Sequence, residues 1–446
     1  MMKIVFLSEV LLFVGSVLGL FRAIITLKWL KKNKPLQIND SYVKNNFFIV
    51  VPVLYEQSVI MNSLRHFSKL SNERVKVIYV TTEKEQKSGN EPTTAELIDN
   101  YLSENPLLNI ERDHYPYPTG VMANQINWAV NKITDPDVWI GIYNVDSEIN
   151  TDTLKYIDCK DKNTVFQQYA YFLSSGNKVI DSAARWQNRW SFCFEFAKVI
   201  ETMWKKKMRI PRLFSFFESF NYVIGHGLFF TKKQFDFFGG VPEDTLNEDN
   251  KLGYILSVKQ VNLEPIPFFE KALFAHSIKV YIKQQSTWFN GPFYAFLYLR
   301  QILHSSDKLT ASFIFRSFIL SFKNYWAAVN WCLFPLIVSV SVLIALFNSQ
   351  PVHLILLFAG IFCYVSIPNY VGTRLIYNFE NIKKPVKIFT FIGDTFFFFI
   401  HCIGPLITIK KHITKQNSFT NKYKTVKVRG VDNVSSVFRN SDTDSL

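Results

Sequence analysis

Acidic and amide side chains follow a short apolar run near the middle of the chain. Residues 138–143 (VWIGIY) are typical of a buried strand, and the turn NVDSE (144–148) comes directly after it. Carboxylate and amide oxygens suit Mg²⁺ or Mn²⁺, whose coordination shells are often completed by substrate phosphates. An Asx turn that ends a strand uses the same residue types, so the turn indicates a metal site only if its surroundings agree.

A second acidic pair, Glu248-Asp249, stands at the start of a segment with helical spacing. Leu252, Ile255 and Leu256 repeat on one face, and the preceding GGVP (239–242) predicts a loop. A carboxylate held at such a point can remove the proton from a hydroxyl group that attacks an electrophilic carbon. The alternative is a helix cap, which is the usual role of an isolated acidic residue at a helix start.

Short apolar runs alternate with helical segments in the same part of the chain. Residues 47–53 (FFIVVPV) predict a strand, residues 57–70 a helix, and residues 75–80 (VKVIYV) a second strand. This alternation predicts a doubly wound α/β sheet with helices on both faces. Because ligands of such sheets gather beyond the carboxyl ends of the strands, the polar groups that follow these strands are expected to line one site.

In this order and spacing, the motifs resemble the family 2 glycosyltransferases across residues 45–290. VPVLYEQ (51–57) and VTTEKE (80–85) are similar to the nucleotide-binding loops of the family, and NVDS (144–147) is similar to its DxD metal motif. GHG (225–227) and GGVPEDTLNED (239–249) resemble its acceptor side, and QQSTW (284–288) stands where the family often has QxxRW. The resemblance implies a GT-A fold, with a mixed sheet, and inverting transfer of a sugar from a nucleotide donor.

The same resemblance implies a set of site residues. Asp249 matches the catalytic base and Glu248 its neighbour. Acceptor contacts are expected from Gly225, His226, Gln284 and Trp288. Donor contacts are expected from Pro52, Glu56, Glu83, Asn127, Asn144 and Asp146, of which Asn144 and Asp146 would also hold Mg²⁺ or Mn²⁺.

Two departures from the family pattern concern the donor side. Asn144 replaces an Asp, so a metal would rest more heavily on Asp146, or on Glu148 if the motif is taken one step later. Val121 stands where a family helix usually carries Lys. A basic residue from the run 205–212 is expected to meet the diphosphate instead, and a membrane-surface patch is the alternative interpretation of that run.

A third departure concerns the type of enzyme. Thr287 replaces the Arg of QxxRW, which argues against a processive synthase that secretes its own polymer. A domain that binds a sugar nucleotide without turning it over is a second rival, and the retained acidic set argues against it. A transporter is disfavoured because most of the chain has the pattern of an α/β domain.

Four apolar segments are long enough to cross a bilayer, which takes about 20 mainly apolar residues. They are residues 4–21, 326–347, 352–373 and 388–409, and the last contains Asp394 and a Gly404-Pro405 break. The first is expected to be a retained anchor rather than a signal peptide, because no small-x-small cleavage site precedes the basic run after it. That run predicts a cytoplasmic catalytic domain. The basic tail then requires one re-entrant segment, for which 388–409 is the candidate.

The composition agrees with a membrane protein. Only 19% of the residues are charged, 48% are hydrophobic and 43 are Phe, whereas soluble proteins carry about a quarter charged residues. We therefore expect an anchor at 1–30, a GT-A domain at 40–290, interfacial helices at 291–325, a membrane region at 326–410 and a basic, polar tail at 411–446.

The formal net charge of +14 favours anionic partners. We expect membrane lipids, a nucleotide-sugar donor, for which the family suggests UDP, and a lipid-linked or polysaccharide acceptor. No nucleic acid is expected: the repeats Arg185/Arg189 and Trp186/Trp190 are interpreted as a membrane-interface surface.

Overall fold

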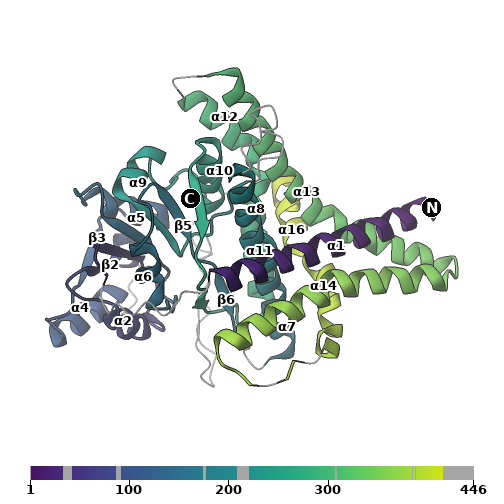
Figure 1. The fold of residues 1–446 in the computed structure, drawn as a ribbon, viewed down its shortest axis with the longest axis horizontal. Coiled ribbons are helices and arrows are strands. Elements are labelled where there is room, and N and C mark those ends of the chain that lie inside the picture. The colour runs from purple at the N-terminus through teal and green to yellow at the C-terminus, as the bar shows by residue number, and fades with distance from the viewer. Residues whose placement is uncertain are drawn as a thin grey trace.

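The computed structural model describes residues 2–33, 43–86, 92–173, 177–207, 220–306, 309–383, 385–386 and 388–414. An α/β domain lies on the left of Figure 1, and long helices project from it to the right. The expected α/β class with long apolar helices at both ends is confirmed. The tail beyond residue 414 and residues 208–212 of the basic run lie outside the described residues.

Seven strands form the main sheet in the order β3-β2-β1-β4-β7-β5-β8. The strands β3, β2, β1 and β4 are parallel, whereas β7 runs antiparallel to both of its neighbours, so the sheet is mixed as expected. A second sheet pairs β6 with β9. The bounds are β1 Phe47–Pro52, β2 Val75–Thr82, β3 Ile110–Tyr115, β4 Trp139–Ile142, β5 Thr164–Gln167, β6 Ala170–Phe172, β7 Leu228–Thr231, β8 Asn262–Pro265 and β9 Glu270–Ala272.

Helices cover both faces of the sheet. Alternate residues of a strand point to opposite faces, so Ile49 of β1 packs in one apolar cluster with α2 and α4, and Val50 packs in another with α5 and α9. The predicted helix at 57–70 corresponds to α2. The bounds are α2 Ile60–Ser68, α3 Glu83–Gln86, α4 Thr94–Glu104, α5 Met122–Asn131, α6 Asp152–Asp158, α9 Lys232–Phe238 and α10 Glu248–Val258.

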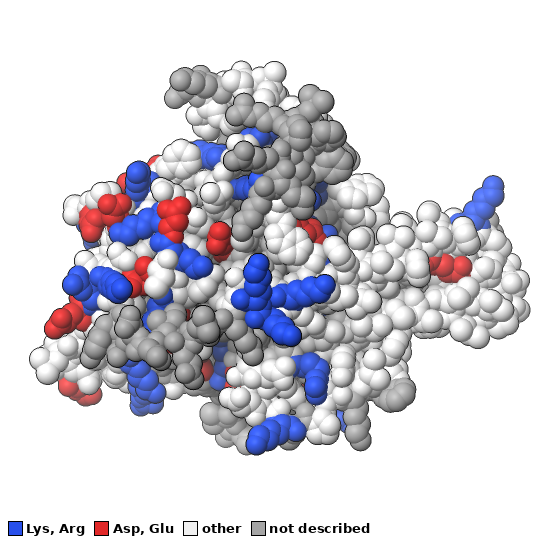
Figure 2. Space-filling view, in the orientation of Figure 1, with Lys and Arg blue, Asp and Glu red and all other residues white. Residues whose placement is uncertain are grey.

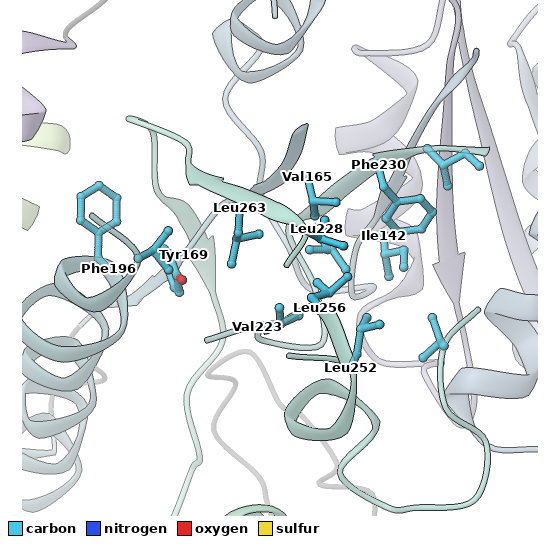
Figure 3. Close-up of a cluster of buried hydrophobic side chains, with 14 of the residues drawn as sticks. Ile142, Val165, Tyr169, Phe196, Val223, Leu228, Phe230, Leu252, Leu256 and Leu263 are labelled. Atoms are coloured by element: carbon cyan, nitrogen blue, oxygen red, sulfur yellow. The ribbon is translucent and has the colours of Figure 1, made fainter. Parts of the chain in front are cut away.

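The helix α10 is fixed under the sheet by its apolar face. Leu252 and Leu256 are buried beside Leu228 of β7 and Ile142 of β4 (Figure 3). Burying side chains of this size stabilises their position by about 1.5–3 kcal/mol each. The packing holds the first turn of α10, which carries Glu248 and Asp249, in a defined place relative to the strands.

Four helical segments have the length and composition to cross a membrane: Met2–Lys32, Ala311–Phe347, Pro351–Phe379 and Phe391–Ile413. Each overlaps one expected segment. The first three are α1, α13 and α14, and the surface of their projecting part is almost without charged side chains (Figures 1 and 2). Polar groups inside it are paired: Ser8 Oγ lies 2.7 Å from Ser341 Oγ, and Glu9 Oε1 lies 2.7 Å from His353 Nδ1.

The fourth segment is broken, as expected, but the break is elsewhere. It consists of the 3-10 helix η3 (Ile388–Phe396), α15 (Phe397–Ile400) and α16 (Ile403–Ile413), so the chain turns at residues 401–402. Pro405 lies in the first turn of α16, where a missing N–H costs no intrahelical hydrogen bond. His412 near the end of α16 contacts Tyr294, which lies outside the candidate spans, at 2.9 Å. The re-entrant interpretation of this segment stays a prediction.

Asp394 in η3 is fully buried and paired with the protein. Its oxygens accept hydrogen bonds of 2.8 and 2.7 Å from Arg185 and one of 2.8 Å from Asn369. Trp186 is buried and its Nε1 lies 3.2 Å from His401 Nδ1. The interpretation of this helix, α7 (Lys178–Trp190), as a membrane-interface surface is therefore wrong: these side chains join α7 to η3, α14 and α15.

Two further helices lead from the α/β domain to the spans. They are α11 (Ile278–Phe293) and α12 (Ala295–Ser305). The following helix α13 begins at Ala311 and continues through residue 326 without a boundary, so no helix end separates the expected interfacial segment 291–325 from the span. Earlier in the chain, a π-helical turn η1 (Ser191–Glu195) joins α7 to α8 (Phe196–Lys207).

Candidate active site

The carboxyl ends of β1, β2 and β4 lie at one edge of the sheet because these three strands are parallel neighbours. Pro52 is the last residue of β1 and pairs with Val80 of β2. Gln125 of α5 joins the two ends, since its Nε2 donates to the carbonyl oxygens of Val53 at 2.9 Å and Val80 at 2.6 Å. This buried amide, which the motifs did not indicate, fixes the floor of the expected donor site.

The loop after β1 is held by Glu85, not by Glu83. Glu85 is buried and accepts hydrogen bonds from the N–H of Tyr55 (2.9 Å), Nε2 of Gln57 (2.9 Å), and both the N–H (2.8 Å) and Oγ1 (2.6 Å) of Thr94. Thr94 Oγ1 in turn accepts from the N–H of Glu56 at 3.0 Å. Glu56, also buried, is therefore positioned by the same network. Sequence reasoning missed Glu85 because it lies two residues beyond the matched acidic position.

Glu83 lies half-buried directly after β2, at the expected edge. Its Oε2 is 3.4 Å from Nε2 of His114 on β3, and Nδ1 of His114 is 3.1 Å from Thr81 Oγ1. This carboxylate is thus oriented by a neighbouring strand and remains partly exposed at the site. Such a placement suits a contact to the polar groups of a nucleoside, which is the donor contact expected of Glu83.

The turn 144–148 follows β4 at the same edge. Asp146 is buried and its Oδ2 accepts a hydrogen bond of 3.0 Å from the N–H of Leu273. Glu148 pairs with Lys271 at 3.0 Å, and Asn144 is half-buried. No group of three or more His, Cys, Asp and Glu side chains in the described part of the chain is arranged to hold a metal. One carboxylate and one amide on a turn do fit a cation whose other ligands are phosphate oxygens.

A second contact fixes the far end of this turn. The Nε2 of His66 on α2 accepts a hydrogen bond of 2.8 Å from the N–H of Ile149. Burial lowers the pKa of His66, against the opposing charge of Glu148, so the neutral imidazole is favoured. A neutral ring is the form with an acceptor nitrogen.

The glycines of GHG (225–227) permit a close approach of the chain to β4 and β5. Gly227 has a φ of +65°, and a β-carbon there would lie 2.4 Å from the carbonyl oxygen of Gln168. Its N–H donates to the carbonyl of Ile142 at 2.7 Å. Nδ1 of His226 contacts Oε1 of the fully buried Glu270. The hydrogen bond to Ile142, two residues before Asn144, therefore holds the segment beside the expected metal turn.

Asp249 faces this glycine segment from the first turn of α10. A β-carbon at Gly225 would lie 3.9 Å from Asp249 Oδ2 and 4.0 Å from the terminal methyl of Met122. Asp249 is half-buried, whereas Glu248 is buried. Backbone N–H groups at a helix N-terminus stabilise a negative charge there. Gly225 thus lies beside the candidate base, and Gly227 is hydrogen-bonded to Ile142, two residues before the candidate metal turn.

Asn127 forms hydrogen bonds to the neighbouring loop that contains Val241 and Glu243. Its Nδ2 donates to the carbonyl of Val241 at 2.8 Å and to Glu243 at 2.7 Å, and its Oδ1 accepts from the N–H of Val241 at 2.9 Å. The φ of +79° at Gly240 lets the loop turn tightly against this amide. Asn127 therefore positions the loop that leads to α10, and a donor contact from it stays a prediction.

The acceptor-side residues Gln284 and Trp288 lie one turn apart on α11. Trp288 is 37% exposed, and Gln284 is half-buried. Gly291, near the end of α11, lies against Asn250, the neighbour of Asp249. The helix is locked to α16 by Ser286, whose Oγ lies 2.7 Å from Thr408 Oγ1. The last turn of α11 thus lies against the first turn of α10, and acceptor contacts from Gln284 and Trp288 stay a prediction.

A buried carboxyl group that no motif indicated, that of Glu195, interacts electrostatically with Asp249 and His226. Glu195 ends the π-helical turn η1, a feature that often occurs at functional sites. Burial raises the pKa of Glu195 to about 8, against hydrogen bonds from Trp190 and Ser191, and the charge of Asp249 raises it further. The raised pKa favours the protonated form of Glu195 at pH 7.

Comparison with known proteins gives likenesses of structure. No protein-family model and no curated protein matches the sequence. Mannosyltransferase PcManGT from Pyrobaculum calidifontis, solved in complex with GDP-Man and Mn²⁺, is 12% identical, with a TM-score of 0.47 over 91% of this chain and 98% of that chain. The 1–349 part of TarS from S. aureus is 13% identical, with a TM-score of 0.42 over 83% and 92%. A further structure of TarS is 14% identical, with a TM-score of 0.37 over 75% and 54%.

Proposed function

We propose that this protein is an inverting glycosyltransferase that moves a sugar from a nucleoside-diphosphate donor to a membrane-associated acceptor. The observation that carries the proposal is the position of Asp249 beside Gly225, because that glycine segment is hydrogen-bonded to the end of β4 next to the turn 144–148. A general base and a site for a charged leaving group are the two parts that direct displacement at a sugar carbon requires.

The residues of this chain would act in one step. Asp249 accepts the proton of the acceptor hydroxyl as the hydroxyl oxygen forms a bond to the anomeric carbon of the donor sugar. The bond from that carbon to the diphosphate oxygen breaks, and its electron pair leaves with the nucleoside diphosphate. Attack from the face opposite the leaving group inverts the anomeric configuration. Glu248, buried beside Asp249, supports the position of the base on α10.

The donor would lie along the carboxyl edge of the sheet. The loop held by Glu85 and the exposed part of Glu83 would contact the nucleoside. Asp146, with Asn144, would hold Mg²⁺ or Mn²⁺. When bound, the cation offsets the charge that develops on the diphosphate. UDP is the nucleotide that the sequence resemblance suggests.

The acceptor would approach from the side of α11, and Trp288, Gln284 and His226 would contact its sugar. The basic residues after the first apolar segment support a cytoplasmic position of this domain. A lipid-linked sugar or nascent polysaccharide would then reach Asp249 along the membrane surface.

The test uses purified, detergent-solubilised full-length protein with a panel of nucleotide sugars, Mg²⁺ or Mn²⁺ and native lipid extract. Release of nucleotide from one donor, lost on addition of EDTA and restored by the metal, is the expected result. Binding of a donor without turnover in every lipid fraction would contradict the proposal and favour a binding module. Long polymeric products from the pure enzyme would identify a processive synthase.

A further inference from the structure

The carboxyl group of Glu270 in β9 is fully buried, and only one of its oxygens has a polar contact. Its Oε1 contacts Nδ1 of His226, whereas its Oε2 has no hydrogen-bond partner in the described part of the chain. Leaving a buried polar atom without a partner costs about 1–3 kcal/mol. Such atoms are rare in folded proteins and call for an explanation, such as a role in the chemistry of a site. The burial of Glu270 therefore points to function rather than to stability.

The main sheet holds the backbones of both residues. Nε2 of Gln167, at the end of β5, donates to the carbonyl oxygen of His226 at 2.7 Å. The carbonyl oxygen of Tyr169 accepts a hydrogen bond of 3.0 Å from the N–H of Glu270. Gln167 and Tyr169 are themselves fully buried. Because both backbones are bonded to one buried segment, the contact between the two side chains is fixed in place.

His226 lies one residue from the point where the chain meets the candidate base. A β-carbon at Gly225 would lie 3.9 Å from Oδ2 of Asp249, and adjacent α-carbons are about 3.8 Å apart. The side chain of His226 is 17% exposed, although its Nδ1 is buried against Glu270. The exposed part of the imidazole ring therefore consists of atoms other than Nδ1.

The strand of Glu270 also contacts the candidate metal turn. The backbones of Lys271 and Glu148 exchange hydrogen bonds of 2.9 and 3.1 Å. The N–H of Leu273 donates to Oδ2 of Asp146 at 3.0 Å. Glu270 is thus joined by its side chain to the segment beside the candidate base, and by its strand to the turn on the donor side.

The contact with Glu270 determines how the ring of His226 can be used. An ionised carboxylate only accepts hydrogen bonds, so Nδ1 carries the proton in this contact. The tautomer and the orientation of the ring are then set, and Nε2 is the nitrogen that can face a substrate. This orientation follows from the contact of Nδ1 alone.

A brace for the glycine segment is the other explanation of the pair. The backbone hydrogen bonds of His226 and Gly227 already hold that segment against Gln167 and Ile142. Buried ion pairs often contribute little net stability. A brace also leaves the missing partner of Oε2 in Glu270 without a reason.

We propose that Glu270 is a positioning residue, which holds the imidazole of His226 so that Nε2 hydrogen-bonds a hydroxyl group of the acceptor sugar at Asp249. The inference rests on the proposed function and adds to its site a residue that does not itself touch the substrate. Asp249 remains the base, and Glu270 affects the rate through the orientation that it gives to His226. A misplacement of about 1 Å in such a site can cost about 100-fold in rate.

The experiment compares four forms of the full-length protein in detergent: the wild type, Glu270→Gln, His226→Ala and the double variant. Nucleotide release is measured with the donor that the wild type consumes, Mg²⁺ or Mn²⁺ and native lipid extract, and the melting temperature is measured alongside. Glu270→Gln keeps the volume of the side chain and removes its charge. The matched control is Glu264→Gln, which makes the same change at a half-buried position of β8 outside the candidate site.

Glu270→Gln is expected to lower kcat by about 10- to 100-fold. The donor KM should not change, because the change affects the ring of His226 and not the donor loops. The melting temperature should match that of the wild type, since Oε2 has no hydrogen bond to lose. In the His226→Ala background, Glu270→Gln should lower kcat no further, because the effects of two residues that act through one contact do not add. Glu264→Gln should resemble the wild type in every measurement.

Three results would overturn the inference. The first is a wild-type kcat in Glu270→Gln. The second is a lower melting temperature with kcat retained where the variant is folded, which would identify a brace. The third is an equal fall of kcat with and without His226, which would show that Glu270 acts by another route.

Failure of the proposed function is distinguishable from these results. It would appear in the wild type itself, as the absence of nucleotide release with every donor and lipid fraction, and it would remove both proposals. Metal-dependent release by the wild type, with kcat unchanged in Glu270→Gln, would support the enzyme and contradict the positioning role of Glu270.

Discussion

The Asp249 carboxylate faces Gly225 across a space that one methyl group would fill. A β-carbon on Gly225 would lie 3.8 Å from Cβ and 3.9 Å from Oδ2 of Asp249, which is ordinary van der Waals contact. The absence of a side chain at residue 225 therefore keeps a path open beside the candidate base. Two residues later, Gly227 has a different reason for being glycine, because its φ of +65° and the nearby Gln168 carbonyl leave no room for a side chain.

Gly225→Ala should fold normally and transfer sugar slowly. Its new methyl group meets no atom closer than van der Waals contact, so the stability change should stay within about 0.5 kcal/mol. Displacing the acceptor by a fraction of an ångström to about 1 Å should lower kcat by about 10- to 100-fold. Thermal unfolding and acceptor kinetics check the two parts. The matched variant Gly227→Ala should instead lose stability by at least about 1–2 kcal/mol. Full activity of Gly225→Ala would mean that the acceptor does not pass residue 225.

The pair Glu83 and Glu85 should separate donor binding from loop structure. Glu85→Gln places an amide nitrogen among four donors, which should cost about 1–3 kcal/mol of stability. Glu83→Gln removes a partly exposed charge and should leave the melting temperature unchanged while the donor KM rises. Differential scanning fluorimetry and donor titrations measure both effects. An unchanged donor KM in Glu83→Gln would remove Glu83 from the donor site.

Glu195 should make the stability of the protein fall with rising pH. Its pKa in the folded state is raised from 4.5 to about 8. Between pH 4.5 and about 8, Glu195 holds a proton in the folded protein that it has released in the unfolded chain. The free energy of unfolding therefore decreases as the pH rises through this range. Glu195→Gln imitates the protonated form and should show a flatter dependence of the melting temperature between pH 4.5 and about 8. Parallel curves for the wild type and Glu195→Gln would show that Glu195 is already ionised at neutral pH.

The Arg185–Asp394 pair should hold the broken helix in place. Removal of one partner of a buried ion pair typically costs about 3–5 kcal/mol, because the other charge stays buried alone. Arg185→Met should therefore unfold at lower temperature in detergent than the wild type. The double variant with Asp394→Leu should recover most of that loss, since replacing both charges by apolar groups is often close to neutral. No loss in Arg185→Met would show that solvent, not Arg185, satisfies Asp394.

Strong local patterns made much of the fold predictable from the sequence. The apolar runs of β1, β2 and β4 are buried on both faces and therefore stand out, and the apolar spacing of α10 marks its start at Glu248. The edge strand β3, with the sequence IERDHY, was not predicted because it is only partly buried and its charged residues mask the strand pattern.

The contacts that fix the site depend on partners far apart in the chain. Arg185 and Asp394 are separated by 209 positions, so no local pattern joins them. The choice between Glu83 and Glu85 depends on Thr94, which reaches Glu85 only in the folded chain. Glu195 lies in an aromatic-rich segment, and only the π-helical turn and the approach of Asp249 distinguish it from a surface carboxylate.

The replacement Asp249→Asn tests the central claim most directly. With the donor that the wild type consumes, the account predicts a loss of kcat of about 10²–10⁴-fold, as expected for removal of a general base. The donor KM should not change, because the nucleotide is held at the strand ends and not by α10. The amide keeps the shape of the carboxylate side chain, so the melting temperature should match the wild type. Undiminished nucleotide transfer in Asp249→Asn would contradict the assignment of Asp249 as the base.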